Sequence, residues 1–98
     1  MLYIVQFEDK PGTGELREKL LESHFAFLDK MRDSVLVAGS MRDVTTDKPL
    51  GGLWIVEAND EADVRNVFKD DPFWTNGLRA SVTIHRWHKA FQDRKTLV

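Results

Sequence analysis

Residues Gly51–Val56 read GGLWIV, two glycines followed by four apolar residues without a polar interruption. A short apolar run of this kind is typical of a strand in the interior of a sheet, where both faces are covered. The preceding stretch, Met41–Leu50, is polar and contains a proline, and before it lies another short apolar run, Val35–Ala38, which ends at Gly39. We therefore expect two consecutive strands that are connected by a polar loop.

A helical pattern precedes the first of these strands. After Thr13, a candidate N-cap, apolar residues recur every three or four positions with charged residues between them. The recurring residues are Leu16, Leu20, Leu21, Phe27, Leu28 and Met31. The stripe predicts a helix of about five turns. Residues opposite the stripe, such as Arg17 and Glu22, are expected to face water.

A second helix is expected after the GGLWIV strand. Its first turn follows Asp60 and is acidic, which favours a helix N-terminus, and its apolar positions continue to Phe68. Pro72 disfavours the helical conformation at Asp71, so this helix is expected to end near Lys69 or Asp70. The proline itself suits the first position of a new short helix.

Strands are also expected near both ends of the domain. Leu2–Phe7 is rich in β-branched and aromatic residues and is followed by turn residues, and Ala80–Trp87 alternates between two usable faces. The order of elements predicts an α+β, ferredoxin-like βαββαβ fold with a four-stranded antiparallel sheet and both helices on one face. Apolar residues lie on both faces of three strands, so we expect the second face to pack in a homodimer. Residues 1–88 are expected to form one domain, and residues 89–98 a charged C-terminal tail.

Composition excludes several functional classes. The 98 residues suffice for one domain, and 16 acidic against 14 basic residues give a formal charge of −2, which disfavours a nucleic-acid partner. Cysteine is absent, so disulfides, cysteine nucleophiles and thiolate metal sites are excluded. No apolar run reaches about eighteen residues and no secretion signal is present, so we expect a cytoplasmic protein without a membrane partner.

His24 is the ionisable residue that the sequence singles out. Steps of three and four along the apolar stripe pass through it, so its ring is expected to point at the core or at a cleft beside it. Without a functional role it would be a core histidine bonded to a backbone carbonyl or to Ser23. Asp71 before Pro72 is a favoured N-cap. A carboxylate there would also orient the imidazole as a general acid or base, and its two oxygens make both tasks compatible.

Other patterns that carry chemistry are weak. His85 and His88 lie three residues apart on a predicted strand and therefore point to opposite faces, so they are not expected to share a metal ion. Gly12 and Gly14 lack the third spaced glycine of a phosphate-binding loop. We accordingly expect neither a metal nor a cofactor.

Short motifs spread over Leu2–Trp87 resemble those of the YciI-like (YCII) family. They are His24 with Phe25-Ala26-Phe27-Leu28, Val37-Ala38-Gly39-Ser40, Gly51-Gly52-Leu53-Trp54, Asp71-Pro72-Phe73, Gly77-Leu78 and Trp87. The resemblance implies a ferredoxin-like fold that dimerises through its sheets into an α+β barrel, with an active-site His–Asp pair that carries over to His24 and Asp71. It also implies chemistry of the kind found in lactone dehydrochlorination and muconolactone isomerisation. Relatives often have Ala-Gly-Pro where this chain has Ala38-Gly39-Ser40, so Ser40 places a hydroxyl at the expected pocket edge.

Residues and resemblance together predict a dimeric, cofactor-independent enzyme of the isomerase or lyase type. His24 would transfer a proton on a small, carbonyl-containing, lactone-like substrate, while Asp71 orients the imidazole and Ser40 or backbone amides hold the substrate oxygen. Trp54 and Phe73 belong to a class of large aromatic residues that usually pack in cores or interfaces, and we expect them also to line the pocket. The alternatives are a non-catalytic dimeric domain that binds a small molecule, and an accessory protein in which His24 is sealed in the core.

Overall fold

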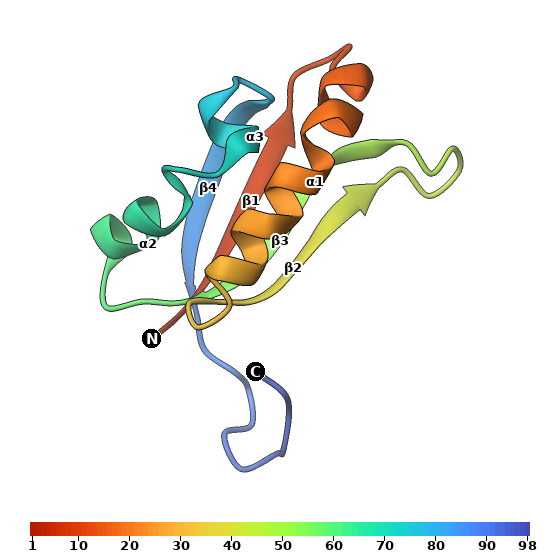
Figure 1. Ribbon diagram of the computed structural model, residues 1–98. Coiled ribbons are helices and arrows are strands. Elements are labelled where there is room, and N and C mark those ends of the chain that lie inside the picture. The colour runs from red at the N-terminus through yellow and green to blue at the C-terminus, as the bar shows by residue number, and fades with distance from the viewer.

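The computed structural model describes all 98 residues and has the expected α+β, ferredoxin-like architecture (Figure 1). Its elements, in chain order, are β1 (Leu2–Asp9), α1 (Gly14–Lys30), β2 (Val35–Arg42), β3 (Pro49–Glu57), α2 (Glu61–Phe68), α3 (Pro72–Thr75) and β4 (Arg79–Trp87). The strands form one antiparallel sheet in the order β2-β3-β1-β4, and the helices lie on one face of it. β3 contains the GGLWIV run and lies between β2 and β1, which confirms the predicted interior position.

The core lies between this sheet and the helices. Alternate residues of β1, namely Tyr3, Val5 and Phe7, are buried in it. The Phe7 ring contacts Trp54 of β3 and Phe68 of α2 edge-on, at centroid distances of 4.9 and 5.3 Å. Burial of each such side chain contributes about 1.5–3 kcal/mol. The centre of the sheet is therefore where α2 is attached.

The β2–β3 hairpin is longer than the sequence indicated. Its connection is residues 43–48 rather than the expected 41–50. Polar and glycine residues are tolerated in the two strands because their backbone groups pair across the ladder, which a single-strand pattern does not reveal. The Asp43 carboxylate holds the turn by accepting hydrogen bonds from the backbone N–H groups of Thr45 and Thr46, at 3.0 and 2.8 Å.

The two glycines at the start of the run are explained by close neighbours. A Cβ atom at Gly51 would lie 1.9 Å from the carbonyl oxygen of Phe7, which is backbone and has no freedom to move aside. A Cβ atom at Gly52 would lie 3.2 Å from Nη2 of Arg79. The glycines therefore allow β3 to approach β1 and leave room for a charged side chain from β4.

Two of the three helices begin with an aspartate N-cap, and of the two predicted N-caps, Thr13 and Asp71, only Asp71 makes the capping bond. Asp60 accepts a hydrogen bond from a backbone N–H of α2 at 2.8 Å, and Asp71 accepts one from Phe73 at the start of α3 at 3.1 Å. Thr13 precedes α1, but its hydroxyl donates to the carbonyl oxygen of Lys10 at 2.6 Å instead of capping the helix. The expected N-cap bond at Thr13 is thus wrong, while Asp71 is confirmed as an N-cap.

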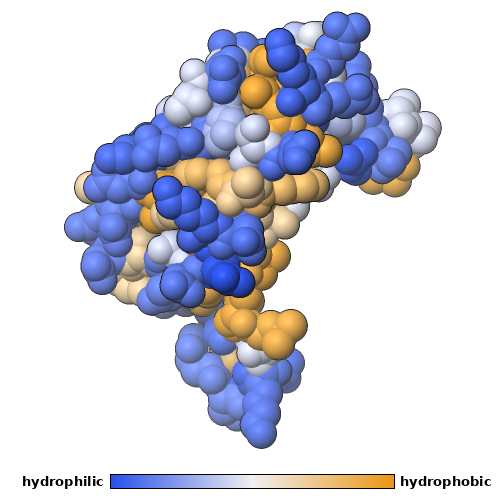
Figure 2. All heavy atoms as spheres, viewed as in Figure 1, coloured by the Kyte–Doolittle hydropathy of each residue, from blue (hydrophilic) through white to orange (hydrophobic).

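The sheet face opposite the helices is uncovered in the single chain. Strand register places on it a set of partly or largely exposed apolar residues: Leu2, Ile4, Val37, Leu53, Ile55 and Trp87. The helix-covered face, by contrast, is mostly hydrophilic with smaller hydrophobic areas between the helices (Figure 2). An apolar face of this extent is typical of an interaction surface.

Residues 88–98 leave the end of β4 as a hook that extends away from the body of the domain (Figure 1). Within the hook, Lys89 Nζ donates to the carbonyl oxygen of Val98 at 2.7 Å, and the Arg94 guanidinium lies 3.7 Å from the centroid of the Phe91 ring. None of the helices combines the length and the apolar character that a membrane crossing requires.

Candidate active site

His24 is the only buried residue of α1, with 6% of its surface exposed. Its imidazole stacks on the fully buried ring of Phe73 at a centroid distance of 3.8 Å and an interplanar angle of 9°. The indole of Trp54 lies 6.3 Å from the imidazole. The apolar stripe of the helix therefore directs the imidazole inward, as the sequence predicted, and α3 supplies the ring that supports it.

Asp71 meets His24 across 47 positions of sequence. Its Oδ1 lies 2.7 Å from Nδ1 of His24, and the aspartate is fully buried. Because a carboxylate only accepts hydrogen bonds, Nδ1 carries a proton and donates it in both the neutral and the protonated imidazole. The pairing thus assigns the tautomer and leaves Nε2 as the ring nitrogen that is not engaged by the carboxylate.

A single oxygen of Asp71 makes both of its contacts. Oδ1 accepts from the imidazole and also from the backbone N–H of Phe73 at 3.1 Å, whereas Oδ2 is buried without a partner. The sequence argument made the two tasks compatible by giving the carboxylate two oxygens, and in that detail it is wrong. Two donors converging on Oδ1 fix the carboxylate, and through it the imidazole, in one orientation.

A cavity of about 250 Å³ opens beside the imidazole. Its walls are apolar residues of α1, the end of β2 and the indole of Trp54. Nε2 of His24 makes no hydrogen bond to the protein, and it is not among the fully buried atoms that lack a partner. Nε2 therefore keeps accessible surface, and the residue borders the cavity rather than being sealed in the core.

The predicted substrate-contacting residues take different places around this cavity. Ser40 and Trp54 line it, whereas Phe73 lies behind the imidazole and does not. The Ser40 hydroxyl accepts a hydrogen bond from Nε of Arg42 at 2.9 Å, which leaves the hydroxyl proton free to donate. The geometry thus places one hydroxyl and one large ring where a substrate would lie, and Phe73 in a supporting position.

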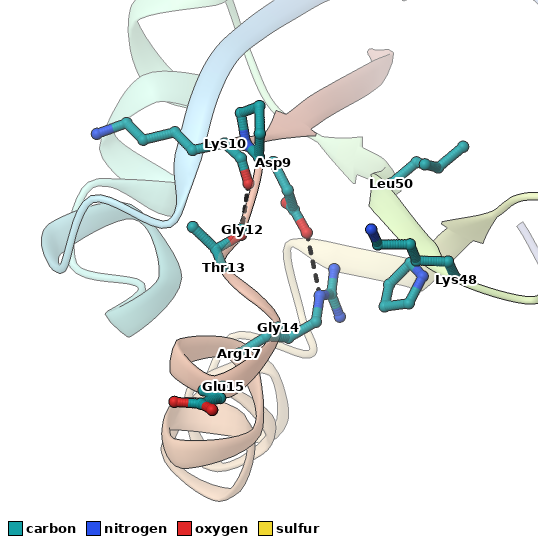
Figure 3. A pocket seen from close by; sticks show the side chains of 11 residues that line it. Asp9, Lys10, Gly12, Thr13, Gly14, Glu15, Arg17, Lys48 and Leu50 are labelled. Carbon is teal, nitrogen blue, oxygen red and sulfur yellow. Dashed lines mark hydrogen bonds and ion pairs between the residues drawn. The ribbon is translucent and has the colours of Figure 1, made fainter.

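Two further arginines line the cavity, and both hydrogen-bond the carboxylate of Asp9. Nη1 of Arg79 donates to Oδ1 of Asp9 at 2.7 Å, and Nε of Arg17 donates to Oδ2 at 3.0 Å, the bond drawn in Figure 3. Both arginines line the cavity. The expectation that Arg17 faces water is wrong, because only 11% of its side chain is exposed. A position seven residues before His24 lies on the same helix face, so the sequence did carry this signal.

Arg79 is held in an unusually dry environment. Its side chain is 2% exposed, and the guanidinium carbon lies 4.6 and 5.0 Å from the ring centroids of Phe7 and Phe73. Burial lowers the pKa of Arg79 from its ordinary value, and the hydrogen bond and charge of Asp9 oppose that shift. A guanidinium keeps its proton at neutral pH even so, and the group is therefore a buried cation at the cavity wall.

A larger hollow of about 600 Å³ lies at the start of α1, between the β1–α1 connection and the β2–β3 hairpin (Figure 3). Lys10, Glu15 and Lys48 line it, together with the Asp9–Arg17 pair. Arg17 borders both spaces, but His24 borders only the smaller one. The His24–Asp71 pair therefore adjoins the smaller cavity and not the larger hollow.

Fold and site together define a ferredoxin-like α+β protein with a buried histidine–aspartate pair at the wall of a small cavity. The YCII-related domain matches residues 1–88, and the chain therefore belongs to the YCII family. This is the family that the short motifs of the sequence resemble. A comparison with curated proteins found no significant match.

Several solved structures share the fold. One is 5-chloro-2-hydroxyhydroquinone dehydrochlorinase (TftG) from Burkholderia phenoliruptrix in complex with 2,5-dihydroxybenzoquinone, with 27% identity, a TM-score of 0.82, and coverage of 90% of this chain and 94% of that chain. A Pseudomonas aeruginosa protein (16% identity, TM-score 0.54) covers 92% of this chain and 93% of its own. A Methanosarcina mazei protein (16% identity, TM-score 0.55) covers 87% and 90%. The last two show the fold alone.

Proposed function

We propose that this protein is a cofactor-independent enzyme that moves a proton on a small, oxygenated ring substrate. The observation that carries the proposal is the 2.7 Å contact between Nδ1 of His24 and Oδ1 of Asp71, with Nε2 left open to a cavity. A buried imidazole with one nitrogen fixed by a carboxylate and the other facing a cavity is suited to general acid–base catalysis. The catalytic residue is His24, and Asp71 is a positioning residue.

The proposed reaction starts when Nε2 of His24 accepts a proton from the bound ring. The imidazolium that forms is stabilised by the Asp71 carboxylate, which accepts a charge-assisted hydrogen bond from Nδ1–H. Returning the proton at another atom of the ring completes an isomerisation. Departure of a leaving group with the freed electron pair completes an elimination, and the imidazolium then releases its proton to solvent.

The similarity to the Burkholderia dehydrochlorinase supports the elimination branch. That protein is named for removal of the elements of hydrogen chloride from a chlorinated hydroxyhydroquinone, and its structure contains a single-ring dihydroxybenzoquinone. A cavity of about 250 Å³ with a tryptophan in its wall is suited to one planar ring. We therefore place substituted hydroquinones and related enolic rings first among the substrates to be tested.

We further propose that the functional unit is a homodimer joined through the uncovered sheet face, as a dimeric α+β barrel. Support comes from the apolar residues that the strand register places on that face, including Leu53 and Ile55 of β3. Isologous packing of two such faces buries the apolar side chains of both copies and removes them from water. The cavity beside His24 is on the helix side of the sheet and remains accessible in such a dimer.

The test is chloride release from 5-chloro-2-hydroxyhydroquinone, with His24→Gln as the active-site variant and His88→Gln, at an exposed position directly after β4, as the matched control. We expect His24→Gln to lower kcat by about 10²–10⁴-fold, the usual contribution of one general acid–base group, while His88→Gln stays near wild type. Equal turnover by wild type and His24→Gln would refute the mechanism. Binding of the ring without turnover by the wild type would instead favour the non-catalytic binding domain.

A further inference from the structure

The permanently charged side chains that line the cavity beside His24 are all positive. Arg17, Arg42 and Arg79 all line it, and no aspartate or glutamate does. Asp9 lies behind Arg17 and Arg79 and is shared between them. Asp9 is the only carboxylate that hydrogen-bonds either guanidinium, so Arg17 and Arg79 share one partner. Arg42, in contrast, has its own partner in Asp47 at 3.5 Å.

Arg79 is the most deeply buried of the three arginines. Its Nη1 is bound to Asp9, but Nε is buried without any partner, and Nη2 makes no hydrogen bond to the protein. An incompletely paired cation in an apolar environment is costly, and such groups persist where they serve a function. Gly52 keeps space for this head group, since a Cβ atom would lie 3.2 Å from Nη2.

The apolar walls and the small volume of the cavity restrict which anion can bind to the arginines. Leu21, Leu28 and Trp54 give the cavity apolar surface, and its volume of about 250 Å³ falls below the roughly 300–1,000 Å³ typical of drug-sized ligands. A fully hydrated inorganic anion would make no apolar contact with these walls. A single planar ring that carries its negative charge on an oxygen satisfies the walls and the guanidiniums together.

We infer that the substrate binds as an anion, with Arg79 and Arg17 holding a negatively charged oxygen of the ring while Nε2 of His24 faces the atom that exchanges the proton. The inference rests on the proposed function, because it names the charge state of the substrate of that same site. It assigns to Arg79 and Arg17 the oxygen-holding task that the sequence analysis gave to Ser40 or backbone amides. The charged oxygen is an enolate or phenolate oxygen of the ring or a carboxylate attached to it.

The experiment is calorimetric binding, so its outcome is independent of turnover. The wild type is titrated with 2,5-dihydroxybenzoquinone, whose hydroxyl protons are lost at neutral pH, and with 2,5-dimethoxybenzoquinone, which has a similar ring but stays neutral. Benzoate and benzamide form a second pair that reports on a carboxylate, and inorganic phosphate tests for an adventitious ion only. We expect an anionic ring to bind about 10- to 100-fold more tightly than its neutral analogue, as charge-assisted hydrogen bonds do.

Variants assign the effect to Arg79. Arg79→Gln is expected to remove the preference for the anion and Arg79→Lys to restore it in part, whereas Arg65→Gln on the outer face of α2 is the control and keeps it. His24→Gln is expected to bind the anion like wild type although its turnover is strongly reduced, which separates the two proposals. Equal affinity of wild type for both members of each pair, tighter binding of phosphate than of either ring anion, or no binding of either anion would overturn the inference. So would an Arg79→Gln protein that unfolds cooperatively and retains the preference.

Discussion

Removal of the Asp71 carboxylate should damage the fold as well as the site, because the same oxygen caps α3 and holds His24. Asp71→Ala deletes the hydrogen bond to the backbone N–H of Phe73, a cap worth about 1 kcal/mol. It also leaves Nδ1 of the buried His24 without a partner, at a cost of about 1–3 kcal/mol. The expected loss in the free energy of unfolding is therefore about 2–4 kcal/mol.

For a domain of this size, such a loss lowers Tm by roughly 10–30 °C. Thermal unfolding followed by circular dichroism measures it, and Asp70→Ala is the matched control because Asp70 is exposed on the preceding position. The control is expected to change the free energy of unfolding by less than about 0.5 kcal/mol, as surface substitutions usually do. An Asp71→Ala protein as stable as the control would refute the reasoning.

A double-mutant cycle isolates the contact itself. In the presence of His24→Ala, the Asp71→Ala change no longer leaves a ring nitrogen unpaired, so its cost should fall by about 1–3 kcal/mol. Asp71→Asn is the milder change, because an amide oxygen can take the place of Oδ1 toward both donors. We expect it to keep most of the stability while lowering kcat about 10- to 100-fold, since a neutral acceptor stabilises the imidazolium less. Additive effects in the cycle would show that the two side chains are not coupled.

The remaining predictions concern the strands and the hairpin. Gly51→Ala should cost about 1–3 kcal/mol or more in urea unfolding, because its Cβ would meet the Phe7 carbonyl oxygen at 1.9 Å, whereas Gly39→Ala, which has open space, should not. Leu53→Glu on the uncovered face should convert a dimer into a monomer in light scattering, and Val44→Glu at the hairpin tip should leave the mass unchanged. Hydrogen bonds from Thr46 and Thr45 lower the pKa of Asp43, so the turn gains stability above the pKa of the unfolded chain and loses it as pH falls through the folded pKa. Amide chemical shifts of Thr45 and Thr46 should follow this titration, and their indifference to acid would contradict it.

The fold was predictable because its information is local. Strand-like runs, the apolar stripe of α1 and the capping aspartates each fix one element, and the order of elements leaves few topologies for a chain of this length. His24 was predictable for the same reason, as its place on the helix stripe is set by helical periodicity. Phe73 shows the limit of this reasoning: its sequence context placed it near the pair, but only packing put it behind the imidazole rather than on the cavity wall.

The cluster of Asp9, Arg17 and Arg79 could not be predicted from local sequence patterns, because it depends on how two strands pair. The register of β1 against β4 shifts between Glu8 and Asp9, and this irregularity brings Arg79 opposite Asp9. A bulge of this kind re-aims a side chain and arises from the pairing of two strands, so neither strand alone carries the signal. Arg17 was recognisable by its spacing to His24, yet its charge suggested the solvent side of the helix.

By itself the sequence determined the element order, the inward position of His24 and the capping role of Asp71, because each follows from the neighbouring residues along the chain. Only the tertiary structure decided that Oδ1 of Asp71 lies 2.7 Å from Nδ1 of His24, that Oδ2 has no partner, and that Arg79 forms the wall of the cavity. Those facts depend on how α1, α3 and β4 pack on the sheet. Distances between side chains that are far apart in sequence are set by that packing, and no local pattern encodes them.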